Sequence, residues 1–208
     1  MLEKKRIKSD LSNITQKWVD LLIPFSDNYS AELSASELAR KSKIPQQTAS
    51  RLLNKLVKLN LINYTKKGKN KLFYFDLEKQ TTKIILNFIE NQKALQFQLK
   101  IKEIPVVINE ILKYCESLII FGSYASDSFS KESDLDIVIL GRCNKEEIKK
   151  IKQKQIIQIN EHHVSYIEFA RILKSKNPLS IEIMKNHVLF GEVSKIVDIF
   201  WRREYERR

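Results

Sequence analysis

The amino-acid sequence predicts an α+β protein in which a basic, mainly helical first domain is joined by a long helix to a second domain built on a small mixed sheet. Residues 1–79 carry sixteen Lys and Arg against eight Asp and Glu, which places +8 of the total charge of +12 in this part of the chain. Residues 80–103 contain no turn signal. In residues 104–208, short apolar runs alternate with turns and amphipathic segments, as expected for strands mixed with helices.

Composition restricts the class of protein. An apolar fraction of 43% over 208 residues is enough for two small cores. The two cysteines, Cys115 and Cys143, are too few for a disulfide framework and lack metal-ligand spacing. No apolar run approaches the roughly 20 residues of a membrane span, and the charged start lacks a signal-peptide core, so we expect a cytoplasmic protein. The basic first domain favours a polyanion partner, and the alternative is a solubilising lysine-rich surface.

The first domain is predicted to begin with two helices. Apolar residues recur at helical spacing in residues 11–22, and Pro24 ends the pattern. Residues 34–42 form the second helix, in which Ser34 and Glu37 have the spacing of a capping box.

A third helix follows the break at Pro45 and has one strongly polar face, rich in side-chain types that read DNA. These polar positions are Gln46, Gln47, Ser50, Arg51, Asn54 and Lys55. Strand-like runs at 61–65 and 71–77 then flank a hairpin tip. The lysines of this tip are Lys66, Lys67 and Lys69.

Two helices joined by a tight turn and followed by a basic hairpin, over residues 30–78, resemble the winged helix-turn-helix of microbial transcription regulators. The resemblance implies that the third helix enters the major groove of double-stranded DNA, with Gln and Arg on base edges and the hairpin lysines on phosphates. The alternative is a winged helix that serves only as a protein-protein or dimerisation module, and the lysine-rich hairpin argues against it.

The linker is predicted to be one long helix from Glu78 to about Lys102, because its apolar residues fall at helical spacing. These residues are Ile84, Ile85, Phe88, Ile89, Leu95 and Leu99. Phe97 and Ile101 lie off that stripe and suggest a second contact surface. We therefore expect a homodimer formed through this helix.

The second domain begins with a predicted helix at 106–114 and contains a central strand, turn and strand. A helix capped by Asn144 follows at 144–155, then a strand at 156–164 and a helix from Ser165 to Leu173. Further helices are predicted at 177–185 and 194–205, with a short extended piece at 188–191 between them. This order implies a small mixed sheet covered by helices.

The central strands carry the residues that suggest chemistry. The apolar run 118–121 ends at Gly122-Ser123, and Asp134-Leu135-Asp136 opens a second apolar run. Because strand side chains alternate, both aspartates point the same way, about 7 Å apart along the strand. Glycine lets a phosphate approach the backbone, and the serine offers its amide and hydroxyl. Two carboxylates with substrate phosphates are a typical Mg²⁺ ligand set, suited to two-metal phosphoryl or nucleotidyl transfer.

In this order and spacing, the residues resemble the polymerase-β-like nucleotidyltransferase superfamily, in particular its minimal prokaryotic members. The resemblance covers roughly residues 104–190. It implies a nucleotidyltransferase fold, Gly122 and Ser123 on the triphosphate of an NTP substrate, and Asp134 and Asp136 on Mg²⁺ or Mn²⁺.

The chain departs from the family pattern in two places. Many members carry Arg-Gly where this chain has Ser126-Asp127. The family's third carboxylate sits on the strand before the helix that Ser165 caps, at the position that aligns with His162. A histidine at this position can bind a metal or act as a general base, although a histidine on a sheet surface is more often an ordinary polar residue. Glu161 is one residue out of register and faces the wrong side unless the strand bulges.

The leading interpretation is a DNA-binding protein that transfers a nucleoside monophosphate from an NTP to a hydroxyl acceptor with Mg²⁺. Its catalytic residues would be Asp134 and Asp136, assisted by His162 or Glu161. One alternative is a transcription regulator whose transferase-fold domain is catalytically degenerate and senses nucleotide or dimerises. A further alternative is a component of a toxin-antitoxin system.

Overall fold

The computed structural model describes residues 16–101, 103–175 and 177–207. The predicted first helix begins at residue 11, so its first residues lie outside these ranges. Its described part is α2, Gln16–Leu22, which is followed by the short 3-10 helix η1, Ile23–Phe25. Within the described ranges, no helix is both long and apolar enough to span a membrane.

The N-terminal part has the predicted winged-helix arrangement. Helices α3, Ala35–Lys41, and α4, Gln46–Lys58, pack together, and the predicted capping box starts α3. The hairpin consists of β2, Asn63–Lys67, and β3, Asn70–Tyr74, paired in an antiparallel register. A short strand that the sequence pattern did not predict, β1, Leu33–Ser34, adds to the other edge of β3.

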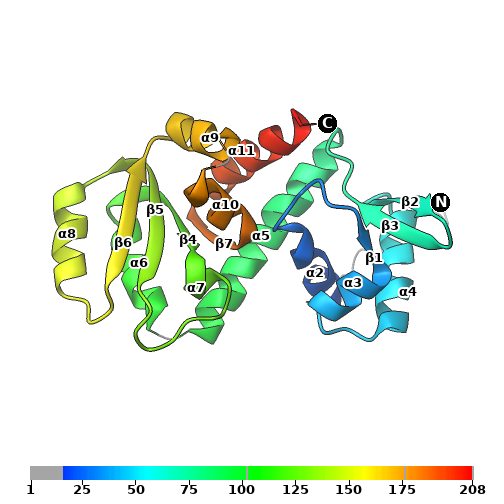
Figure 1. Ribbon diagram of the computed structural model, residues 1–208, viewed down its shortest axis with the longest axis horizontal. Coiled ribbons are helices and arrows are strands. Elements are labelled where there is room, and N and C mark those ends of the chain that lie inside the picture. The colour runs from blue at the N-terminus through cyan, green and yellow to red at the C-terminus, as the bar shows by residue number, and fades with distance from the viewer. Residues whose placement is uncertain (1–15, 102, 176, 208) are drawn as a thin grey trace, which may run out of the picture.

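The predicted long helix is present as α5, Gln80–Lys100. It runs between the winged helix, at the right of Figure 1, and the larger sheet, at the left. Leu86 and Ile89 are buried in the core that α5 shares with the winged helix, whereas Ala94 and Phe97 are buried beneath the larger sheet. The helix therefore contributes to both cores.

The larger sheet is mixed, as predicted, with strand order β6-β5-β4-β7. Strand β4, Cys115–Phe121, is antiparallel to both β5, Leu135–Cys143, and β7, His187–Gly191. Strand β6, Ile159–Val164, runs parallel to β5 on the other side. The segment predicted as a short extended piece at 188–191 is thus a full member of the sheet, because its backbone groups pair with β4.

Helices cover both faces of this sheet. Apolar side chains of α6, Ile104–Leu112, and α8, Lys145–Gln153, pack on one face. The other face is covered by α9, Tyr166–Lys174, α10, Pro178–Lys185, and α11, Val193–Tyr205. The cap of α8 by Asn144 and the capping boxes of α3 and α9 are present as predicted, because these signals depend only on residues a few positions apart.

The core between the winged helix and the sheet is continuous and contains a buried polar cluster. The Tyr29 hydroxyl donates to Glu90 Oε1 at 2.8 Å, and His187 Nε2 lies 3.3 Å from the same oxygen. All three side chains are essentially inaccessible to solvent, and Phe200 packs against Tyr29 and His187. The cluster therefore joins the segment after α2, helix α5 and strand β7.

Candidate functional site

Gly122 brings the backbone directly against Asp136. Strand β4 ends at Phe121, and Gly122 opens the short helix α7, Gly122–Ala125, with φ +68°, a left-handed conformation that favours glycine. A Cβ at this position would lie 2.6 Å from Asp136 Oδ2. The predicted turn is therefore a four-residue helix whose first residue leaves no room for a side chain beside the carboxylate.

The two aspartates lie together on one face of β5. Asp136 pairs with Phe121 of β4 on one side and with Asn160 of β6 on the other. The Asn160 side-chain amide donates to Asp134 Oδ2 and to Asp136 Oδ1, each at 3.2 Å. Both carboxylates are partly exposed to solvent. One amide thus holds two acids that would otherwise repel each other.

Asn160 is a site residue that the sequence pattern did not predict. The resemblance to the nucleotidyltransferase superfamily pointed to His162, and the pattern of β6 alone does not say which of its residues lies beside Asp136. The parallel register of β5 and β6 decides this, because it places Asn160 next to Asp136 and His162 next to Val138. The only signal in the sequence is an amide near the start of the strand that lies next to the aspartates. This signal can be recognised only once the register of the two strands is known.

The two candidate third residues lie in different places. His162 is on the same face as Asp136, is exposed, and has its ring centroid 6.2 Å from that of Phe121. Glu161 is on the opposite face, where its carboxylate pairs with Lys152 of α8 and lies 3.9 Å from His163 Nε2. The β5-β6 pairing continues without a bulge, so the structure does not bring Glu161 to the aspartates.

Ser123 stands in the first turn of α7 beside a loop of hydroxyl side chains. Its carbonyl accepts hydrogen bonds from the Ser128 amide at 3.0 Å and from Ser126 Oγ at 3.2 Å. At the position where the family carries Arg-Gly, Asp127 pairs with Lys100 at the end of α5. A lysine distant in sequence therefore balances the negative charge of Asp127 at this position.

An aromatic pair borders the same loop. The rings of Tyr124 and Phe129 stack with centroids 4.5 Å apart. Burial, together with the negative charges of Glu103 and Asp134, raises the pKa of Tyr124 above its ordinary value. Tyr124 therefore remains a neutral phenol near neutral pH and can donate a hydrogen bond.

The donor set beside Gly122 fits a magnesium ion. Mg²⁺ in proteins is held by one or two carboxylates and completes its shell with water and substrate phosphates. Asp134 and Asp136 supply two carboxylates that one amide holds together, and Gly122, which has no side chain, lies directly beside them. Among the described residues, no group of three His, Cys, Asp or Glu side chains could hold a metal.

The predicted DNA-reading residues lie on α4 and on the hairpin beside it. Gln47, Arg51 and the hairpin lysines at 66, 67 and 69 are exposed. Lys71 of β3 donates to Asn54 Oδ1 at 2.9 Å, which fixes the hairpin next to the polar face of α4. The other predicted positions make local contacts: Gln46 donates to Ser36, the Ser50 carbonyl accepts from Asn54, and Lys55 lies over the Trp18 ring.

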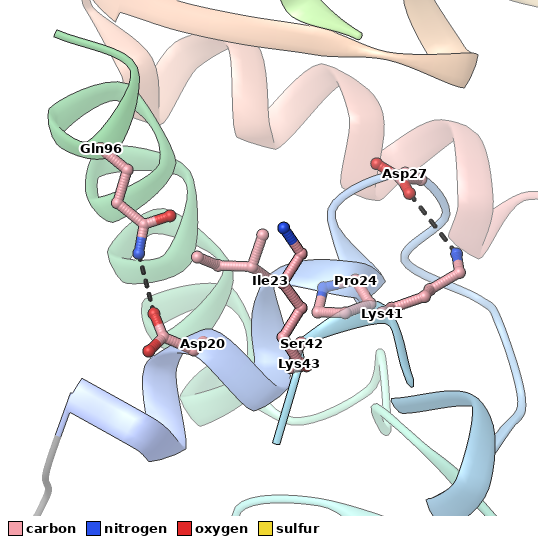
Figure 2. A pocket seen from close by; sticks show the side chains of 8 residues that line it. All are labelled: Asp20, Ile23, Pro24, Asp27, Lys41, Ser42, Lys43 and Gln96. Atoms are coloured by element: carbon pink, nitrogen blue, oxygen red, sulfur yellow. Dashed lines mark hydrogen bonds and ion pairs between the residues drawn. The ribbon is translucent and has the colours of Figure 1, made fainter. Parts of the chain in front are cut away.

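A separate pocket lies between α2, η1, α3 and α5, with a volume of about 390 Å³ (Figure 2). Two pairs of polar side chains lie in its lining: Gln96 donates to Asp20 at 2.8 Å, and Lys41 lies 3.6 Å from Asp27. None of the predicted site residues lines this pocket.

Comparison with known proteins agrees with both halves of the fold. The family model of the nucleotidyltransferase domain matches residues 101–190, and the model of the MarR family matches residues 26–69. A protein of Methanocaldococcus jannaschii described as "Putative protein adenylyltransferase MJ1547" is 30% identical over 100 residues, which are 44% of this chain and 72% of that protein. A solved structure of TrmBL2, described as an archaeal chromatin protein, aligns over 98% of this chain and 97% of its own, with 11% identity and a TM-score of 0.28.

Proposed function

This chain belongs to the nucleotidyltransferase-domain family and carries a MarR-type winged helix in front of that domain, and on that basis we propose that it is a DNA-binding nucleotidyltransferase. It would transfer a nucleoside monophosphate from an NTP to a hydroxyl acceptor. The observation that carries this proposal is that the carboxylates of Asp134 and Asp136 lie together directly beside Gly122. The adenylyltransferase description of the relative makes ATP the first nucleotide to test.

The proposal assigns a role to each group in the site. Asp134 and Asp136 would hold Mg²⁺, which would supply positive charge to the phosphates when bound. The backbone of Gly122 and Ser123 would bind the triphosphate, and Asn160 would keep both carboxylates turned toward it. The acceptor oxygen forms a bond to the α-phosphorus, the bond to pyrophosphate breaks, and the hydroxyl proton leaves. His162, exposed on the same face, is the candidate to receive that proton.

Transfer can be tested with ATP labelled at the α-phosphate, Mg²⁺ or Mn²⁺, and acceptors that include the protein itself, DNA and small hydroxyl compounds. We expect Asp136→Asn to lower the rate by about 100-fold or more, since it removes charge without changing shape. Asp20→Asn, on α2, is the matched control and should keep the wild-type rate. Absence of transfer to every acceptor, or equal rates in wild type and Asp136→Asn, would refute the enzyme.

A regulator without turnover is the second candidate, and Asn160 favours it. The residue bonded to both aspartates is an amide, whereas active members of the family carry a third carboxylate on this strand. In that case ATP would bind and change the affinity for DNA while remaining intact. A DNA affinity that depends on ATP, with no product formed, would select this candidate over the enzyme.

The proposed DNA surface has its own test. If Lys66, Lys67 and Lys69 each contact one phosphate, replacing all three by alanine should reduce the magnitude of the slope of log K against log salt by roughly 3. Replacing Lys145, Lys149 and Lys154, which are exposed on and after α8, removes the same charge as a control and should leave the slope nearly unchanged. Equal effects of the two triple variants on DNA affinity would contradict a DNA site on the winged helix.

A further inference from the structure

Helix α5 exposes a stripe of large apolar side chains. Ile84 is 63% exposed, Phe88 51%, Leu95 48% and Leu99 75%. Their spacings of four, seven and four residues place them on one side of a helix with 3.6 residues per turn. The predicted stripe therefore divides in the folded chain, since Ile89 is buried while these four side chains face solvent. Contiguous exposed apolar surface of this kind marks an interaction site.

The stripe is also free of charge in a strongly basic protein. The positions that share this side of the helix are Thr81, Asn91, Gln92 and Gln98, all uncharged. The four charged residues of α5 point elsewhere and pair within the chain. These pairs are Lys83 with Asp198, Glu90 with His187, Lys93 with Asp27, and Lys100 with Asp127. The side of α5 that would face a second molecule therefore brings no charge of its own to the contact.

The order of the apolar residues along the helix is symmetric. Ile84 and Leu99 lie at equal distances from the point between Asn91 and Gln92, and so do Phe88 and Leu95. If a second α5 ran antiparallel across this point, each outer residue would face the partner's outer residue and each inner residue the partner's inner one. A two-fold interface requires this self-complementarity, because the same patch must serve both molecules.

We propose that this chain forms a homodimer in which the two α5 helices pack antiparallel about a two-fold axis between Asn91 and Gln92. Phe88 of each chain contacts Leu95 of the other, and Ile84 contacts Leu99. The apolar stripe spans about 22 Å of helix at 1.5 Å per residue. At the axis, the side-chain amides of Asn91 and Gln92 can form hydrogen bonds with those of the other chain. The opposite side of α5 packs on β7 and α11, so the interface leaves both cores unchanged.

The mass in solution, measured by light scattering after gel filtration, tests the dimer. Wild type should have twice the chain mass of 24.5 kDa. Phe88→Glu and Leu95→Lys should each dissociate at least about 100-fold more readily, because each places a charge against an apolar partner. Ile167→Glu, at a 67% exposed isoleucine on α9, is the matched control and should remain a dimer. A monomeric wild type at about 100 µM would overturn the proposal and leave the stripe to another partner.

Mixing the two variants tests the antiparallel order. In a mixed antiparallel dimer, the glutamate introduced in one chain forms an ion pair with the lysine introduced in the other, and one native contact of Phe88 with Leu95 remains. The mixture should therefore regain twice the chain mass. In a parallel pair, position 88 faces position 88 and position 95 faces position 95, so each charge still meets an apolar side chain. A mixture that remains monomeric would refute the proposed arrangement.

Discussion

Replacing Gly122 by alanine tests the closest contact of the site. The left-handed backbone at Gly122 costs a residue with a Cβ about 1–2 kcal/mol. The new methyl group would also lie 2.6 Å from Asp136 Oδ2, so that carboxylate must rotate away. Forcing it off its rotamer adds about 0.5–1.5 kcal/mol. The same methyl group would hinder a phosphate that approaches this part of the backbone.

A matched glycine separates these two costs. Gly68, in the hairpin of the winged helix, has φ +62° and nothing within 4 Å of a built Cβ. Gly68→Ala should therefore cost only the backbone strain, which corresponds to a fall in Tm of about 2–8 °C for a protein of this size. Gly122→Ala should cost more, and the excess should disappear when Asp136→Ala is also present, because the opposing carboxylate is then absent.

Thermal unfolding of Gly68→Ala, Gly122→Ala, Asp136→Ala and the Gly122→Ala/Asp136→Ala double variant measures the loss of stability. Calorimetric titration with ATP and Mg²⁺ measures nucleotide binding. We expect Gly122→Ala to abolish nucleotide binding, whereas Gly68→Ala retains it. If Gly122→Ala costs the same with and without the Asp136 carboxylate, the contact is not significant energetically. If binding of ATP is unchanged in Gly122→Ala, the backbone of Gly122 is not a phosphate site.

Two further predictions concern acids. Asn160→Asp places a third carboxylate beside Asp134 and Asp136, so the variant should have a lower Tm than wild type when no metal is present. Adding Mg²⁺ should then raise the Tm of the variant by more than it raises that of wild type. An equal rise in both proteins would exclude a metal at this place. Burial on its own raises the pKa of Glu90, but the charge and hydrogen bond of His187, with Lys93 and Tyr29, outweigh it and hold the pKa below the ordinary value of 4.5. The ionised carboxylate of Glu90 therefore stabilises the folded state above pH 4.5, and this stability is lost as the pH falls through the lowered pKa of the folded state. The free energy of unfolding in urea should then be larger for wild type than for Glu90→Gln above pH 4.5, and the difference should shrink at lower pH. A stability difference independent of pH down to about 3 would contradict this linkage.

Short-range signals in the sequence were sufficient for the elements that carry the site. The capping residues of α3, α8 and α9, the lysine-rich hairpin and the strands that flank Gly122 all depend on residues within a few positions of one another. The same local rule places Asp134 and Asp136 on one face, because strand side chains alternate. For this reason the fold class and the central motif could be predicted without a structure.

The composition of the site beyond those residues depends on contacts between segments far apart in the chain. The register of β6 against β5 brings Asn160 to both aspartates and turns Glu161 toward Lys152. The end of α5 brings Lys100 to Asp127, 27 residues away. Neither pairing leaves a periodic signal in the sequence. For the strands, a register shift of one residue turns every side chain to the other face of the sheet, and the residue pattern of β6 does not show which register is formed.

The two aspartates, the glycine before them and the basic helix and hairpin could be identified from the sequence, because neighbouring residues encode local geometry. The folded chain was needed to show that one amide bonds to both aspartates and that Ile84, Phe88, Leu95 and Leu99 remain outside the core. Burial and strand register depend on which segments pack together, and short stretches of sequence do not specify this packing. An amphipathic pattern shows which face of a helix is apolar, but it does not show which of its apolar residues a neighbouring element covers.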